Sequence, residues 1–208
     1  RIFSMGDRGD GQYVIALDEE TGKPLWSTRI GSVHNDPDGF SGPRGTPTVD
    51  GALLYAVGTD GILVCLESAT GKERWRKDFQ RDFGGRMMSQ WPWAESPLVD
   101  GDRVVVTPGG ARAGIVAMEK TTGKEIWRAA IPRIGSQGAD GAGYSSIVIS
   151  NGGAVKQYIQ LMGRGLVSLR ASDGWYMWGN NAVANDIANI STPVVKGNYV
   201  FASTGYGT

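Results

Sequence analysis

The residues whose types could carry binding or catalytic chemistry gather in four stretches, 31–45, 79–95, 131–144 and 180–190. The second stretch is the richest, because it holds tryptophans, methionines and arginines close together. Exposed Trp, Met and Arg side chains form adaptable surfaces for protein partners. They could equally be lid residues that pack over strand ends, and the sequence leaves both interpretations open. The candidate binding residues are His34, Arg44, Arg86, Met87, Trp91, Trp93, Glu95, Tyr144 and Asn189.

Metal and nucleophilic chemistry find little support in these stretches. His34 is the only histidine, and no second His or Cys lies near it at metal-ligand spacing. No Gly-x-Ser-x-Gly elbow is present. The glycines at 84–85, at 109–110 and on either side of Arg164 lack the context of a phosphate loop. Those around Arg164 instead predict a turn that places this side chain outward. We therefore predict no catalytic residue and no metal site.

Composition and charge narrow the class of protein. The 208 residues carry a formal net charge of zero, with 21 basic and 21 acidic side chains interspersed. This pattern gives no electrostatic footprint for nucleic acid. No apolar run approaches the ~20 residues of a membrane span, so no transmembrane segment is predicted. The single cysteine, Cys65, lies in an apolar run and is predicted to be a buried thiol.

The elements that position the candidate residues come from an internal repeat. The segments 14–26, 63–75 and 115–127 match closely, and a worn copy covers 166–178. Their turn glycines are separated by 49, 52 and 51 residues, and so are the tryptophans that close them. The glycines are Gly22, Gly71, Gly123 and Gly174, and the tryptophans are Trp26, Trp75, Trp127 and Trp178.

Each repeat predicts four short strands. In the second copy they cover 47–49, 53–57, 63–67 and 73–77, and tight turns containing glycine join them. Four antiparallel strands per repeat are typical of a propeller blade. We expect each closing tryptophan to lay its ring across the neighbouring blade. The predicted fold is an all-β propeller of four-stranded antiparallel blades.

The strand pattern makes the whole chain, 1–208, a single propeller segment with about four blades' worth of sequence. A partial blade covers 1–30, blades cover 46–78, 96–130 and 145–180, and a partial blade covers 191–208. Closed wheels need roughly four to eight blades. Either the remaining blades of the same propeller lie on further sequence, or several copies complete one ring, and we favour the first. The connections from one blade to the next are the four long stretches, and they gather on one face. We call it the long-loop face.

The motif Ala-x-Asp-x-x-Thr-Gly-Lys-x-x-Trp, found at 16–26, resembles the signature of quinoprotein-type propellers with PQQ-like repeats. The resemblance covers nearly the whole chain. The segments 42–48, 82–89, 143–146 and 203–208 resemble planctomycete-type proteins similar to BamB, the propeller lipoprotein of the outer-membrane β-barrel assembly machinery. This resemblance implies an eight-bladed wheel, about half of which is present, and a periplasmic or otherwise exported location.

Three functions stay open on that resemblance. The first is a non-catalytic scaffold or binding module of the bacterial cell envelope, which needs no cofactor and recognises a protein or peptide partner through the long-loop face. The second is an alcohol dehydrogenase dependent on PQQ and Ca²⁺, with Glu95, Asp186 and Asn189 as oxygen ligands and Trp91 or Trp93 beneath the quinone. Such enzymes typically have an adjacent Cys pair, whereas this chain has only Cys65. The third is binding of a carbohydrate or another small ligand in the central funnel.

Overall fold

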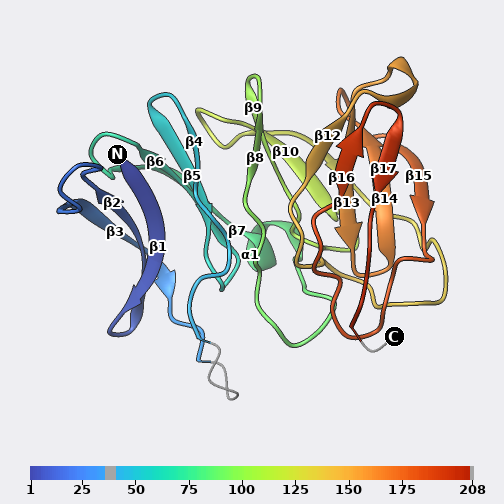
Figure 1. Ribbon diagram of the computed structural model, residues 1–208, viewed down its shortest axis with the longest axis horizontal. Coiled ribbons are helices and arrows are strands. Elements are labelled where there is room, and N and C mark those ends of the chain that lie inside the picture. The colour runs from blue at the N-terminus through green and yellow to red at the C-terminus, as the bar shows by residue number, and fades with distance from the viewer. Residues whose placement is uncertain (36–40, 207–208) are drawn as a thin grey trace.

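The computed structural model describes residues 1–35 and 41–206, which form five antiparallel sheets in chain order. We number these sheets blades 1 to 5. They stand side by side, from blade 1 (blue) to blade 5 (red) in Figure 1. Blades 2, 3 and 4 have four strands each, hydrogen-bonded in the order of the sequence. This is the all-β architecture of antiparallel four-stranded blades that the repeat predicts. The number of blades in a closed wheel stays a prediction.

The strand bounds follow the repeat. Blade 1 contains β1 (Ile2–Arg8), β2 (Gly11–Leu17) and β3 (Pro24–Ser32). Blade 2 contains β4 (Thr48–Asp50), β5 (Leu53–Val57), β6 (Ile62–Glu67) and β7 (Glu73–Asp78). Blade 3 contains β8 (Leu98–Asp100), β9 (Arg103–Val106), β10 (Ile115–Glu119) and β11 (Glu125–Ala129). Blade 4 contains β12 (Val148–Ser150), β13 (Gln157–Met162), β14 (Gly165–Arg170) and β15 (Tyr176–Asn180). Blade 5 contains β16 (Val194–Lys196) and β17 (Tyr199–Phe201).

The described residues contain two short helices. They are the single turn η1 (Gly152–Ala154), between β12 and β13 of blade 4, and α1 (Phe79–Phe83), in the second long connection. We did not predict α1. Its start is capped by the Asp78 carboxylate, which accepts a hydrogen bond from the Arg81 N–H, and its end by Gly84 at φ 63°. The helix buries Phe79, whose ring meets Trp93 edge-on with a centroid distance of 6.0 Å. Among the described residues, no helix is long and apolar enough to cross a membrane.

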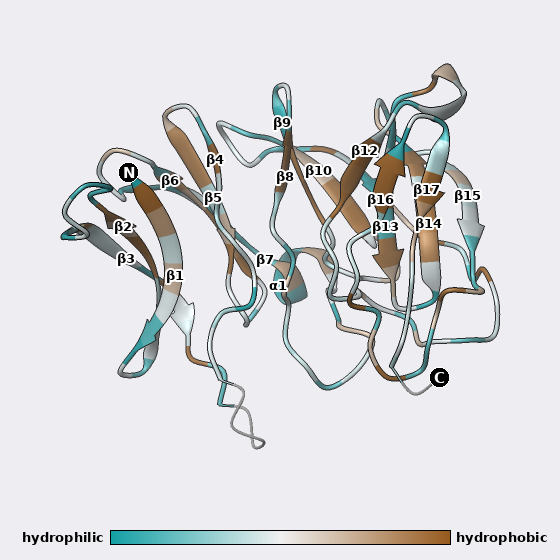
Figure 2. Cartoon of the chain, viewed as in Figure 1, coloured by the Kyte–Doolittle hydropathy of each residue, from teal (hydrophilic) through white to brown (hydrophobic). Residues whose placement is uncertain are grey.

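Tryptophans join successive blades. Each indole N–H of the first three repeats donates to a backbone carbonyl in the turn between the third and fourth strands of the next blade. The bonds are Trp26 to Ser68 at 3.3 Å, Trp75 to Lys120 at 3.1 Å and Trp127 to Ala171 at 3.3 Å. The rings extend the apolar clusters between the blades, which appear as brown strands in Figure 2. The Trp178 indole instead donates to Gln157 of its own blade, at 3.0 Å.

The turn glycines are the surfaces on which these rings rest. Gly71, Gly123 and Gly174 have φ angles of 73°, 69° and 73°, a region that L side chains rarely adopt. A Cβ atom on Gly123 would lie 2.8 Å from Trp75, and one on Gly174 would lie 2.5 Å from Trp127. Gly22 has the same backbone conformation, with φ 67°, but a Cβ atom there would meet nothing within 4 Å. At the boundaries between blades, glycine is therefore required for two reasons, the positive φ angle and the close contact with the tryptophan ring.

Gly22 and Gly123 form a matched pair that separates backbone strain from ring contact. We expect Gly22→Ala to cost about 1–2 kcal/mol, the penalty for an L residue in the left-handed region. Gly123→Ala should cost about 1–3 kcal/mol more, because its methyl group displaces Trp75. Urea unfolding of both variants measures the difference in the free energy of unfolding. Equal costs would show that the ring contact does not require glycine.

Candidate functional site

A ladder of hydroxyl groups aligns the innermost strands where they begin on the long-loop face. The backbone N–H of Thr46 donates to the Ser96 hydroxyl at 3.0 Å, and the N–H of Ser96 donates to the Ser146 hydroxyl at 2.9 Å. The N–H of Ser146 continues the series to Thr192, at 3.0 Å. Each rung joins one blade to the next. The ladder therefore places equivalent residues of four blades side by side, although they lie about one repeat apart in sequence.

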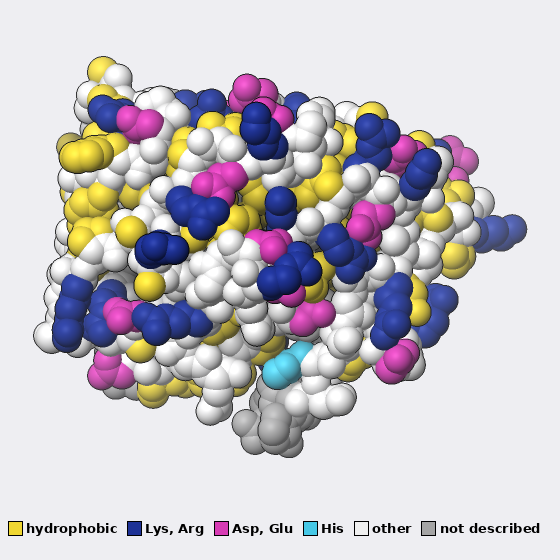
Figure 3. All heavy atoms as spheres, turned by 180° about the vertical axis from the view of Figure 1, so that it is seen from behind, with side chains coloured by type: hydrophobic (Ala, Val, Ile, Leu, Met, Phe, Trp, Pro, Cys, Tyr) yellow, Lys and Arg dark blue, Asp and Glu magenta, His cyan; other side chains and the backbone are white. Residues whose placement is uncertain are grey.

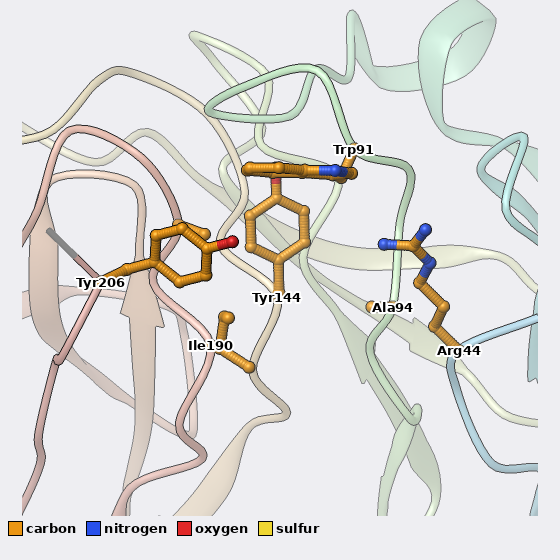
Figure 4. A pocket seen from close by; sticks show the side chains of 7 residues that line it. Arg44, Trp91, Ala94, Tyr144, Ile190 and Tyr206 are labelled. Atoms are coloured by element: carbon orange, nitrogen blue, oxygen red, sulfur yellow. The ribbon is translucent and has the colours of Figure 1, made fainter. Parts of the chain in front are cut away.

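The residues two positions before each rung line one pocket. They are Arg44, Ala94, Tyr144 and Ile190, and Trp91, Ala188 and Tyr206 complete the lining. The pocket has a cavity volume of about 430 Å³. In Figure 4 the Trp91 ring covers the hydroxyl end of Tyr144, while Arg44 and Tyr206 reach in from opposite sides. We call this site the funnel pocket.

The aromatic walls of the funnel pocket pack against one another and are anchored by one hydrogen bond outside it. Trp91 meets Tyr144 edge-on and lies tilted against Tyr206, with centroid distances of 6.1 Å in both pairs. The Tyr144 hydroxyl shares a hydrogen bond of 2.6 Å with Ser89, and burial raises the pKa of this phenol. Ile190 and Tyr206 stay 52% and 48% exposed, so an apolar surface faces solvent. The pocket can hold an apolar side chain beside a guanidinium group.

The structure brings a second group of candidate residues together in a neighbouring hollow. His34, Arg86, Met87, Trp91 and Trp93 all line a cavity of about 440 Å³ on the long-loop face. Trp91 is the residue that both cavities share. Trp93 is only 6% exposed, because it packs in the core between blades 2 and 3. It therefore supports the hollow from beneath, as the lid interpretation expects.

Asn189 is a structural residue behind the funnel pocket. It is fully buried, and its amide donates to the carbonyls of Met162 and Gly163, both at 2.9 Å. Its side-chain oxygen accepts from the Asn185 N–H at 3.0 Å, and its own carbonyl accepts from the Tyr144 N–H at 2.8 Å. These bonds hold the fourth long connection against blade 4. Asn189 is therefore not placed to contact a ligand directly.

Glu95 is also buried, at 3% exposure, between Ala94 of the funnel pocket and Ser96 of the ladder. Its Oε1 accepts the Thr107 N–H at 2.7 Å, and Oε2 has no partner among the described residues. Burial raises the pKa of the carboxyl to about 7, and the hydrogen bonds from Thr107 oppose this shift. A buried carboxyl with half of its acceptors unpaired destabilises the folded state once it ionises.

These bonds do not fit the oxygen donors of a calcium and quinone site. Glu95 and Asn189 are engaged within the core, and Asp186 is exposed and accepts from the Gly138 N–H at 2.7 Å. Among the described residues, no three His, Cys, Asp or Glu side chains cluster as metal ligands do. Burial raises the pKa of the Cys65 thiol to about 11, which keeps it in the unreactive thiol form.

Comparison with known proteins identifies the family. The model of the family described as outer membrane protein assembly factor BamB matches residues 10–208. The chain belongs to the BamB family. A BamB from Kangiella koreensis is 25% identical over 93% of this chain, and one from Burkholderia pseudomallei is 28% identical over 57% of it. The chain spans less than half the length of these relatives, 44% and 28% respectively.

Solved structures agree on the fold. BamB from Moraxella catarrhalis superposes with a TM-score of 0.59 and 16% identity, covering 96% of this chain and 53% of that protein. A quinohemoprotein alcohol dehydrogenase from Comamonas testosteroni gives a TM-score of 0.56 at 20% identity, covering 85% of this chain and 34% of that one. At these identities the likeness shows the BamB-type propeller fold alone. It does not choose between a binding module and a dehydrogenase.

Ionisation of Glu95 should make the stability of the chain depend on pH. Because the folded pKa is about 7 and the ordinary value is 4.5, the folded state keeps a proton between these values that the unfolded chain has released. The free energy of unfolding should therefore fall as pH rises through this window, and level off above it. Glu95→Gln keeps the acceptor for Thr107 and removes the charge, so we expect it to be more stable at pH 8 by up to about 3 kcal/mol.

Urea unfolding at pH 4.5, 6 and 8 measures this effect. Glu20→Gln is the matched control, since Glu20 is an exposed residue of the turn in blade 1. If the free energy of unfolding of Glu95→Gln fell with pH between 4.5 and 7 as steeply as that of the parent protein, Glu95 would not be the group that titrates.

Proposed function

We propose that the chain is a non-catalytic binding module of the bacterial cell envelope, which recognises a protein or peptide partner through its long-loop face. The observation that carries the proposal is the funnel pocket, where fixed aromatic rings and the Arg44 side chain surround a cavity of about 430 Å³. Rigid aromatic and Arg side chains around a desolvated pocket are the usual anchors of protein recognition. An apolar side chain of the partner would enter between Trp91 and Tyr206.

Membership of the BamB family supports the setting. The relatives from Kangiella koreensis and Burkholderia pseudomallei are named outer membrane protein assembly factors. For this chain we infer an exported, periplasmic location and a partner that takes part in envelope assembly. The dehydrogenase alternative is disfavoured, because two of the three proposed calcium donors, Glu95 and Asn189, are buried in the core and Asn189 is bound to backbone carbonyls. No cofactor is needed for the proposed role.

Removal of the half-buried Trp91 ring and the exposed Tyr206 ring of the funnel pocket should sharply reduce partner recovery. We expect Trp91→Ala combined with Tyr206→Ala to reduce recovery of the bound partner by about 30-fold, the loss of one interface hot spot. The control is Trp175→Ala combined with Tyr199→Ala. These rings are 68% and 81% exposed. Trp175 lies in the turn between β14 and β15, and Tyr199 is the first residue of β17, so both are at the ends of the blades opposite the long-loop face.

The measurement is recovery of proteins from a detergent extract of bacterial envelopes on the immobilised chain, scored by mass spectrometry. Both double variants are first compared with the parent by thermal unfolding. Equal recovery on both variants would contradict the proposal. Native mass spectrometry that finds a small molecule in the pocket, with no protein partner, would favour the small-ligand alternative.

A further inference from the structure

A groove on the long-loop face lies between blades 3 and 4, and it shares no lining residue with the funnel pocket. It has a cavity volume of about 200 Å³. The turn between β9 and β10, the connection after β11 and the turn between β13 and β14 form its walls. Three arginines, Arg86, Arg133 and Arg164, and one carboxylate, Asp140, line it. We call it the arginine groove.

The charges of the arginine groove do not balance. Asp140 pairs with Arg164 and, at 3.2 Å, with Arg86, and these two arginines and Arg133 lower the pKa of its carboxyl. Arg133 donates to the Gly135 carbonyl at 3.3 Å and has no ion-pair partner among the described residues. One carboxylate therefore faces three guanidinium groups. Among the residues that line the groove, guanidinium groups thus outnumber carboxylates by two.

This imbalance differs from the arrangement elsewhere on the surface. Basic and acidic side chains are interspersed over the face seen in Figure 3. Several arginines of the fourth strands and their turns instead pair one to one with a carboxylate three residues away, as in Arg76 with Glu73 and Arg128 with Glu125. Such local pairs leave no surplus charge. The surplus in the arginine groove arises because its arginines come from three segments far apart in the sequence.

The backbone holds the arginine groove in shape before any partner arrives. The Arg86 N–H donates to the Pro108 carbonyl at 3.0 Å, and the Arg86 carbonyl accepts from the Ala142 N–H at 2.9 Å. Gly109 lies between these segments at φ 78°, and a Cβ atom on it would stand 2.2 Å from the Arg86 oxygen. The Arg164 side chain is only 17% exposed and donates to the Gly138 carbonyl at 3.2 Å. The backbone of the groove therefore loses little conformational freedom when a ligand binds.

We propose that the arginine groove binds an acidic segment of the protein partner, with carboxylates on Arg86 and Arg133 and an apolar side chain against Ile131 and Pro132. The inference rests on the proposed function and names the chemistry of the partner. Guanidinium groups pair with carboxylates through two parallel hydrogen bonds, so the match is geometric as well as electrostatic. A nucleic acid would need a longer basic stripe along its backbone.

Fluorescence anisotropy with two labelled peptides of about ten residues tests the inference. Both contain the same apolar residues, and one has four glutamates where the other has four glutamines. We expect the Glu peptide to bind the full chain about tenfold more tightly than the Gln peptide, and to lose most of this advantage between about 50 and 300 mM NaCl. Arg86→Glu combined with Arg133→Glu should weaken its binding by about tenfold or more.

Lys72→Glu combined with Lys124→Glu is the matched control, because it changes the net charge equally at exposed turns on the opposite face. Equal weakening by both double variants would overturn the inference and reveal only a general charge effect. A labelled oligothymidylate is the second control. If it binds the parent as tightly as the Glu peptide does, and if the double variant Arg86→Glu with Arg133→Glu no longer binds it, the groove is a general anion site and the inference is overturned.

The recovery experiment keeps this inference separate from the proposed function. Envelope partners that are lost with Trp91→Ala and Tyr206→Ala, but retained with Arg86→Glu and Arg133→Glu, would overturn the acidic segment and leave the proposed function standing. Binding of the Glu peptide to the groove, without any recovered protein partner, would contradict the proposed function instead. Loss of the partner in both double variants is the expected result.

Discussion

The contact between one indole ring and the glycine turn of the next blade is the constraint on which the rest of this structure depends. At three successive boundaries the indole N–H donates to the carbonyl of the residue three positions before the turn glycine. The ring and the hydrogen bond together fix how far each blade is displaced from the one before. They act at the ends of the blades opposite the long-loop face. Because the same displacement is repeated from blade to blade, it also determines where the long connections meet on the other face.

That repeated step explains why distant residues share one pocket. The hydroxyl ladder closes only if successive innermost strands start at the same height, and its rungs join Thr46, Ser96 and Ser146 to the following blade. With the starts aligned, Arg44 and Tyr144 both line the funnel pocket, as Figure 4 shows. The binding face is therefore a product of blade docking. The long connections supply the side chains, and the repeat supplies their positions.

The sequence predicts the blades better than it predicts the face they carry. The periodic glycines and tryptophans report contacts between neighbouring repeats, so strands of the second copy lie within one residue of their predicted bounds. The rung residues Thr46, Ser96 and Thr192 each precede a proline in the sequence, but this pattern does not show that their hydroxyl groups join successive blades. The pocket residues differ in type from blade to blade, and no repeat pattern marks them. Their grouping follows from the ladder, which only the folded chain displays.

Burial also separates residues that the sequence treats alike. Trp91 and Trp93 both occur in the second long connection, but Trp91 lines the funnel pocket whereas Trp93 packs in the core. The Phe79 ring that receives Trp93 belongs to α1, a helix that we did not predict. We expected Arg164 to point outward, but its side chain is only 17% exposed, because it pairs with Asp140 of the preceding connection. Each difference comes from a contact between segments that are far apart in the sequence, and the local sequence pattern does not predict such contacts.

The energetic cost of the fold is concentrated directly behind the funnel pocket. Among the described residues, the buried side-chain polar atoms without a hydrogen-bond partner are Trp93 Nε1 and Glu95 Oε2. These two residues flank Ala94, which forms part of the pocket wall. Unpaired buried groups are rare because each costs about 1–3 kcal/mol. Natural proteins tend to leave buried polar atoms without hydrogen bonds at functional sites. The two unpaired atoms on either side of Ala94 fit this tendency. The position of this cost thus favours the funnel pocket as the centre of the binding face.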